Sequence, residues 1–127
     1  MDIANLTRKF DLTEGHWIDE IPNHPNVRLC VRSTNYKPFR VATAGMGRRR
    51  TKQLQTDEGL VDFSILLDWE GVTSGDKPVK YDPKVAMAIL TADDDLGIGQ
   101  SFRMAVEWSG DQVADLLAKQ TDEAAGN

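Results

Sequence analysis

The segment LDWEGV (residues 67–72) is followed, across a short polar loop, by PVKYDPK (residues 78–84). The first segment is an apolar run that ends in a Trp-Gly turn. The second segment predicts the start of a helix, because Asp82 can accept hydrogen bonds from the free N–H groups of a first helical turn. Pro83 then occupies a position where its missing N–H has no consequence. Together the two segments predict a turn followed by a helix.

Upstream, residues 17–21 and 27–33 carry strand-forming residues. In the second of these runs, apolar and polar residues alternate, which predicts one buried and one exposed face. Residues 22–26 (PNHPN) separate the runs and consist mostly of turn-forming proline and asparagine. We therefore expect an N-terminal β-hairpin.

A helix is predicted after Asn35, with Pro38 in its first turn and Phe39, Ala42 and Met46 along one side. Glycines within this run lower its helix propensity by up to about 1 kcal/mol each relative to alanine. We therefore expect the helix to bend, fray or break near Gly47.

Residues 57–69 fit two patterns. Asp57 is a suitable N-cap for a helix with apolar residues at helical spacing, whereas residues 61–69 also alternate as in a strand. The leucine content and the capping aspartate favour the helix.

The helix capped by Asp82 carries a short apolar stripe, namely Val85, Ala86, Ile89 and Leu90. A last helix is predicted over residues 101–119, burying Phe102, Val106, Val113, Leu116 and Leu117, with a kink at Ser109-Gly110. Residues 121–127 offer nothing to bury and are expected to form a flexible tail. The sequence thus predicts a small α+β domain over residues 1–120, with a β-hairpin packed on three or four helices and a mostly helical C-terminal half.

The composition is that of a soluble globular domain, with 127 residues, 40% hydrophobic and 28% charged. No apolar run approaches the roughly 20 residues of a membrane-spanning helix, and the N-terminus lacks the plan of a secretory signal. Cys30 is the single cysteine, so no internal disulfide can form. These features predict a cytoplasmic protein.

Charge is unevenly distributed along the chain. Residues 1–56 contain ten Lys and Arg against five Asp and Glu, whereas residues 57–127 contain five against fifteen. The two parts therefore carry formal charges of +5 and −10. Such asymmetry favours self-association or a charged partner, and it predicts binding that is sensitive to salt.

Metal and phosphate sites are poorly supported by the sequence. Asp93, Asp95 and Gly97 resemble the opening of a calcium loop, but the twelfth position, which requires a bidentate glutamate, is Met104. The Gly-x-Gly pairs at 45–47 and 97–99 lack the Gly-Lys-Ser/Thr of a phosphate loop. We expect no metal ion and no cofactor.

Catalytic residues are equally hard to assign. His16 and His24 have no second histidine at helical spacing, and Cys30 stands among apolar strand residues. Asp68 and Glu70 flank Trp69, but nothing in the sequence places them in one cleft. We expect that the protein is not an enzyme.

Binding to other macromolecules is better supported. The run RRRTK (residues 48–52) is basic enough to contact phosphates, but it has no interleaved aromatic residues. Tryptophan side chains often anchor protein interfaces, which makes Trp17, Trp69 and Trp108 candidates for contact with a partner. A place in the core is an equal alternative for each of them.

Several segments of the chain, in order, resemble the small tail assembly chaperones of long-tailed bacteriophages and prophages. The matching segments are residues 15–22 (GHWIDEIP), 27–33 (VRLCVRS), 38–40 (PFR), 66–72 (LLDWEGV) and 78–83 (PVKYDP). The resemblance covers roughly residues 10–118, and its motifs are less specific than a catalytic signature.

The resemblance implies a protein that binds the tape-measure protein, helps to recruit subunits of the major tail tube protein, and is absent from the finished virion. It also implies location in the host cytoplasm, no membrane contact and no nucleic-acid binding. A tape-measure protein is long and prone to aggregate, so its binder needs an apolar groove with charged rims. The residues assigned to partner binding are Trp17, Phe39, Arg48, Arg49, Arg50, Trp69 and Tyr81.

Two alternatives remain open at this level. The protein could be a structural tail or head–tail joining component that stays in the virion. It could also be a small phage protein that binds nucleic acid or modulates the host, using Arg48, Arg49, Arg50 and Lys52.

Overall fold

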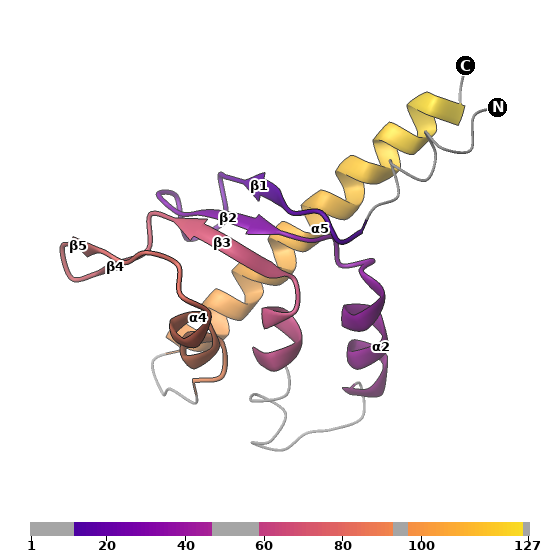
Figure 1. Ribbon diagram of the computed structural model, residues 1–127. Helices are drawn as coiled ribbons and strands as arrows, with labels where there is room; N and C mark the ends of the chain where they lie inside the picture. Colours follow the sequence, from indigo (N-terminus) through magenta and orange to yellow (C-terminus); the bar gives the residue numbers. More distant parts are fainter. Residues whose placement is uncertain (1–11, 47–58, 93–96, 126–127) are drawn as a thin grey trace.

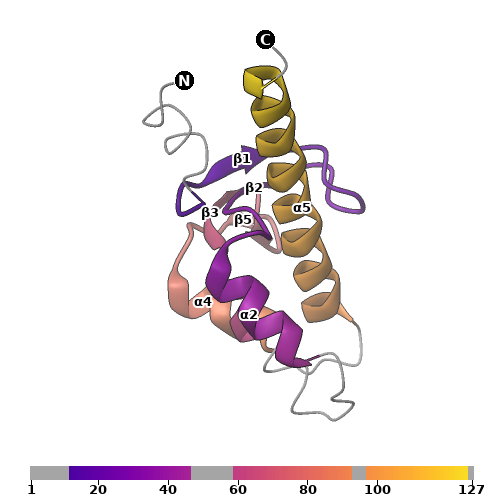
Figure 2. The ribbon, with the colours of Figure 1, turned by 90° about the vertical axis from the view of Figure 1, so that its right-hand side faces the viewer.

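The computed structural model describes residues 12–46, 59–92 and 97–125. A three-stranded antiparallel sheet is built from β1 (His16–Ile18), β2 (Arg28–Val31) and β3 (Leu66–Glu70), in the order β1-β2-β3. The long helix α5 (Ile98–Ala125) runs across one face of this sheet, and α2 (Lys37–Met46) and α4 (Pro83–Leu90) both lie on its β3 side, α4 at the left and α2 at the right of Figure 1 (Figures 1 and 2). The predicted α+β fold with an N-terminal hairpin is confirmed.

The register of the sheet separates a core face from an outer face. Ile18 lies opposite Leu29, and Leu29 lies opposite Trp69, and these side chains face the core, where Leu29 is fully buried. One position along, Trp17, Cys30 and Asp68 form the corresponding row of the outer face. A register shift between Cys30 and Val31 marks an irregularity opposite Leu67.

Helix α2 begins at Lys37, one residue later than the Asn35 cap predicts. The backbone N–H of Asn35 donates to Ser33 Oγ at 2.9 Å, and this local turn delays the helix to Lys37. Phe39 is buried, as its place on the apolar side of the helix requires. The predicted break near Gly47 and the basic run at 48–52 lie outside the described residues.

The ambiguous segment contains both structures in succession. Residues 59–63 are helical, whereas Leu66–Glu70 form β3, so the preference for helix over all of residues 57–69 was wrong for the second half. Pairing with β2 decides the outcome, because it buries Leu66 and Trp69 against the core. Asp57 lies outside the described residues.

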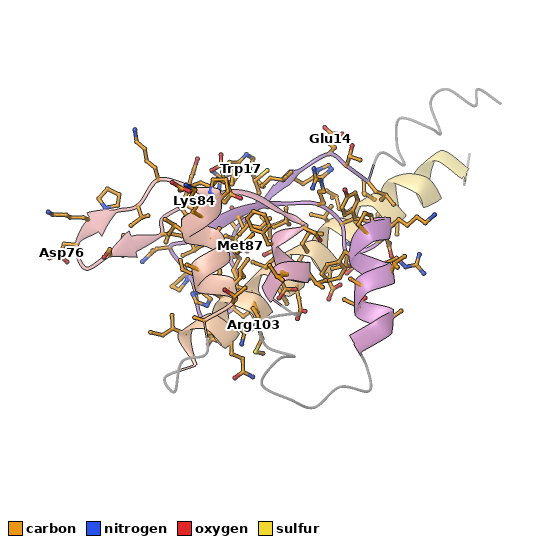
Figure 3. All side chains as sticks on the ribbon, turned by 60° about the horizontal axis from the view of Figure 1, so that its bottom comes forward. Glu14, Trp17, Asp76, Lys84, Met87 and Arg103 are labelled. Carbon is orange, nitrogen blue, oxygen red and sulfur yellow. The ribbon has the colours of Figure 1, made fainter. Side chains whose placement is uncertain are left out.

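Gly71 makes the predicted turn after Trp69, with a left-handed φ of +83°. The following segment, expected to be a loop, forms a small hairpin of β4 (Thr73–Ser74) and β5 (Lys77–Pro78). This hairpin projects from the body of the domain, with Asp76 labelled at its tip (Figures 1 and 3).

The helix start at Asp82 is confirmed. Its carboxylate Oδ1 accepts a hydrogen bond from the backbone N–H of Lys84 at 2.8 Å, and Pro83 is the first residue of α4. Ala86 and Leu90 are fully buried, as the apolar stripe predicts. At the other end of α4, the buried Arg103 of α5 (labelled in Figure 3) donates from Nη1 to the Leu90 carbonyl at 2.6 Å.

Helix α5 is longer than predicted. It begins at Ile98, continues without interruption through Ser109 and Gly110, and extends to Ala125, beyond the predicted end at Lys119. Gly110 lies where a side chain would meet Thr34 and Ile65, so this glycine allows the helix to approach the sheet closely. Phe102, Val106 and Val113 are buried as expected, but Leu116 is exposed.

Candidate protein-binding surface

Two adjoining hollows lie where the segment from β1 to the β1–β2 turn faces helix α5. Their volumes are about 110 and 410 Å³, and both are lined by Trp108. We call their combined lining the Trp108 surface. Its residues are Trp17, Ile18, Asp19, Glu20, Ile21, Pro22 and Asn23 on one side and Ser101, Met104, Ala105, Trp108 and Gln112 on the other.

The β1–β2 turn is fixed against α5 by a buried anchor and local hydrogen bonds. Ile21 is almost completely buried, and its carbonyl accepts from the backbone N–H of His24 at 3.0 Å. The ring Nε2 of His24 lies 3.0 Å from Ser101 Oγ, in hydrogen-bond contact. Glu20 and Asn23 both have left-handed backbones, with φ of 55° and 67°. The turn is therefore held in one conformation beside the helix.

The α5 side of the surface is a stripe of residues spaced three or four apart, which places them on one face of the helix. Met104 is 61% exposed and Trp108 is half-buried. A flexible methionine beside a partly exposed tryptophan is a composition that favours protein contact. Sequence reasoning assigned Met104 no binding role, although its spacing of four residues from Trp108 indicates a shared face.

Trp17 lines the larger hollow from the outer face of the sheet and is 40% exposed (labelled in Figure 3). The guanidinium carbon of Arg28 lies 5.1 Å from the Trp17 ring centroid, a cation–π distance. Arg28 Nη1 is also 2.9 Å from Glu70 Oε2, so its charge is compensated across the sheet. Arg28 therefore orients the Trp17 ring without leaving an unpaired positive charge beside it.

The other residues predicted to bind a partner are distributed differently. Phe39 and Trp69 are 6% and 4% exposed, so in this fold the protein itself covers their rings. Tyr81 is half-buried, and its hydroxyl donates to the Leu66 carbonyl at 3.3 Å. Arg48, Arg49 and Arg50 lie outside the described residues. Of the four predicted residues that the structure describes, Trp17 is the one that lines the Trp108 surface.

Trp69 has a structural explanation that requires no partner. Its indole Nε1 donates to the Val79 carbonyl at 2.8 Å, which ties β3 to the segment before α4. Its ring makes edge contacts with Tyr81 and Phe102, at centroid distances of 5.0 and 5.9 Å. Such contacts make Trp69 a junction between the sheet, the segment before α4, and α5.

The candidate catalytic residues are not brought together as a reactive pair. Burial, and then the nearby Asp68 carboxylate, raise the pKa of the Cys30 thiol above its ordinary value of 9.0. A reactive cysteine requires the opposite shift. Asp68 Oδ1 accepts from the Trp69 backbone N–H, and Glu70 pairs with Arg28. These contacts account for both carboxylates as parts of the sheet.

Within residues 12–46, 59–92 and 97–125, no group of three or more His, Cys, Asp or Glu side chains is placed to hold a metal ion. In the same residues, no helix is both long and apolar enough to cross a membrane.

Comparison with known proteins identifies the origin of the chain. A family model described as the YdaY prophage protein matches residues 34–127. The chain belongs to the YdaY prophage protein family. It is therefore a prophage protein, as the resemblance predicts at the level of phage origin. No curated protein and no solved structure gave a match.

The region shared with the YdaY family begins after β2 and includes α2, β3, α4 and α5. The Trp108 surface thus combines a family element, the α5 stripe, with the β1 hairpin, which precedes the matched residues.

Proposed function

We propose that this prophage protein is a tail assembly chaperone that binds a tape-measure protein and helps to recruit tail-tube subunits. It acts in the host cytoplasm through protein contacts, without cofactor or catalysis. The observation that carries the proposal is the exposure of Trp17 and Met104, with the half-buried Trp108, around two adjoining hollows. Aromatic and methionine side chains beside a concave surface are the usual anchors of protein interfaces.

Membership of a prophage family supports this proposal because tail assembly is one of the tasks that phage genes encode. Trp69 and Phe39 are buried, so we place the proposed contact at the Trp108 surface instead of at these core residues. A second copy of the chain could bind the same surface. Size-exclusion chromatography of the purified protein measures its oligomeric state and so tests this self-association.

Co-expression with the tape-measure protein of the same prophage tests the proposal. We expect the chaperone to keep that partner in the soluble fraction and to co-elute with it. If the partner is equally soluble alone and no complex elutes, the proposal fails.

A matched pair of variants localises the contact. Met104 and Val41 are exposed to nearly the same extent, 61% and 63%, and both lie on helices, but Val41 is on α2 outside the Trp108 surface. We expect Met104→Ser to reduce co-elution with the tape-measure protein, whereas Val41→Ser leaves it unchanged. Equal effects of the two substitutions would place the contact elsewhere.

Mass spectrometry of purified particles separates the chaperone from a structural tail component. The chaperone is expected to be absent from finished virions, whereas a tail or head–tail joining component would be present in stoichiometric copies. An electrophoretic shift assay at physiological salt tests the nucleic-acid alternative, because phosphate contacts give binding that weakens steeply as salt rises.

A further inference from the structure

We infer that the Trp108 surface takes an amphipathic helix whose apolar stripe is flanked by basic residues. This inference rests on the protein binding proposed for the same surface, and it adds the shape and charge of the segment that is bound. Two observations carry it: the dimensions of the surface and the sign of the charges along its edge.

The dimensions favour a helix over an extended strand. From Ser101 to Gln112 the α5 stripe spans eleven residue steps, about 16 Å or three helical turns. A stripe of this length matches apolar residues at i, i+4, i+7 and i+11 of a helix laid into a groove, which also span eleven residue steps. Strand addition would have to use the edge of β1, which has three residues and therefore spans about 10 Å. That edge is too short to bind an extended segment by backbone pairing alone.

The charges favour a basic partner. Asp19 and Glu20 are exposed residues in the lining of the larger hollow, and no lysine or arginine is among the described residues that line either hollow. Arg28, beside Trp17, is paired with Glu70 at 2.9 Å. Complementary charge across an interface favours the correct partner and speeds its encounter.

The backbone of Glu20 is consistent with this role. At φ 55° Glu20 has a left-handed backbone, which is disfavoured for any residue other than glycine. Such conformations occur preferentially where a side chain has a task beyond stability. Here the conformation keeps a carboxylate at the edge of the surface.

Two synthetic peptides test the inference directly with the full 127-residue chain. Both are helical peptides of about 18 residues with the same leucine stripe, and they differ only in lysine or glutamate on the polar face. We expect the lysine peptide to bind at least about tenfold more tightly than the glutamate peptide at low salt, and to weaken as salt is raised. Isothermal titration calorimetry measures both affinities.

Charge-matched variants separate this surface from general attraction to an acidic protein. Asp19→Asn with Glu20→Gln removes two negative charges at the Trp108 surface, and Asp76→Asn with Glu14→Gln removes two exposed ones that line neither hollow. We expect the first pair to weaken binding of the lysine peptide several-fold and the second pair to change it little. Equal losses from the two pairs, or equal binding of both peptides, would overturn the inference.

A third peptide with the same lysines and leucines in strict alternation tests the shape. The inference predicts weaker binding of this peptide, and equal binding would refute the helical form of the partner. If none of the peptides binds but co-elution of the tape-measure protein still depends on Met104, the charge and shape inferred here are wrong while the proposed function stands. If the lysine peptide binds and the tape-measure protein does not, the proposed function is wrong and the chemistry of the surface stands.

Discussion

Gly71 offers the sharpest test of how the chain turns after β3. Its φ of +83° lies in the left-handed region, and a side chain at this position would be directed at the backbone of the β1–β2 turn. An added Cβ would lie in severe conflict with the Asn26 carbonyl oxygen and only 2.9 Å from its carbon. Gly71→Ala must therefore distort the turn, displace Asn26, or both.

The expected cost has two parts. The left-handed backbone disfavours alanine by about 1–2 kcal/mol. Displacing the neighbouring backbone adds a comparable amount, which gives a total loss of about 3 kcal/mol in the free energy of unfolding. For a domain of this size, a loss of that order lowers the melting temperature by about 12 °C.

Gly75→Ala is the matched control, because Gly75 also has a positive φ, +61°, but an added Cβ would meet nothing within 4 Å. We expect it to lose only the backbone part, about 1 kcal/mol. Urea denaturation followed by tryptophan fluorescence measures both variants. If Gly71→Ala is no less stable than Gly75→Ala, the close approach of Gly71 to Asn26 is refuted.

Three further predictions concern capping, alkaline pH and backbone strain. Asp82→Ala should lower the free energy of unfolding by about 1 kcal/mol through loss of the α4 cap, and Asp82→Asn, which keeps an acceptor, should lose less in the same urea titration. Burial and then the Asp68 and Asp82 carboxylates raise the pKa of Tyr81 above 10.0, so the folded state favours its neutral form. The pKa of Cys30 is likewise raised above 9.0, so the free energy of unfolding should be constant below pH 9 and fall as pH rises through these two pKa values. Tyr81→Phe should reduce the fall above pH 10. An identical decline in that variant would contradict a contribution of Tyr81 to it. Glu20→Gly should stabilise the fold by up to about 1 kcal/mol and weaken the binding of the lysine peptide. A loss of stability in thermal melts would contradict backbone strain at this residue.

The sequence was sufficient where the structure depends on neighbouring residues. Asp82 and Pro83 specify the start of α4 through bonds within one helical turn, and the turn after Trp69 follows from the conformational freedom of Gly71. The β1–β2 hairpin was predictable for the same reason, because its alternation and its proline-rich turn lie within a short stretch.

Tertiary pairing decided what short patterns left ambiguous. Residues 57–69 fit both a helical and a strand period, and the pairing of β3 with β2 selected the strand from Leu66 onward. Asn35 was a plausible cap, yet a competing hydrogen bond to Ser33 moved the start of α2. Leu116 was expected on the buried side of α5, but it is 41% exposed, whereas the next residue, Leu117, packs against the core.

The candidate binding surface belongs entirely to this second category. The sequence identified tryptophans as anchors, but it contained no signal that would bury Trp69 and leave Trp17 exposed. The hydrogen bond that holds the β1–β2 turn against α5 joins His24 to Ser101, which are 77 residues apart in the chain. Local propensities therefore determined the turn at Gly71 and the Asp82 cap, whereas long-range packing determined which aromatic side chains remain available to a partner.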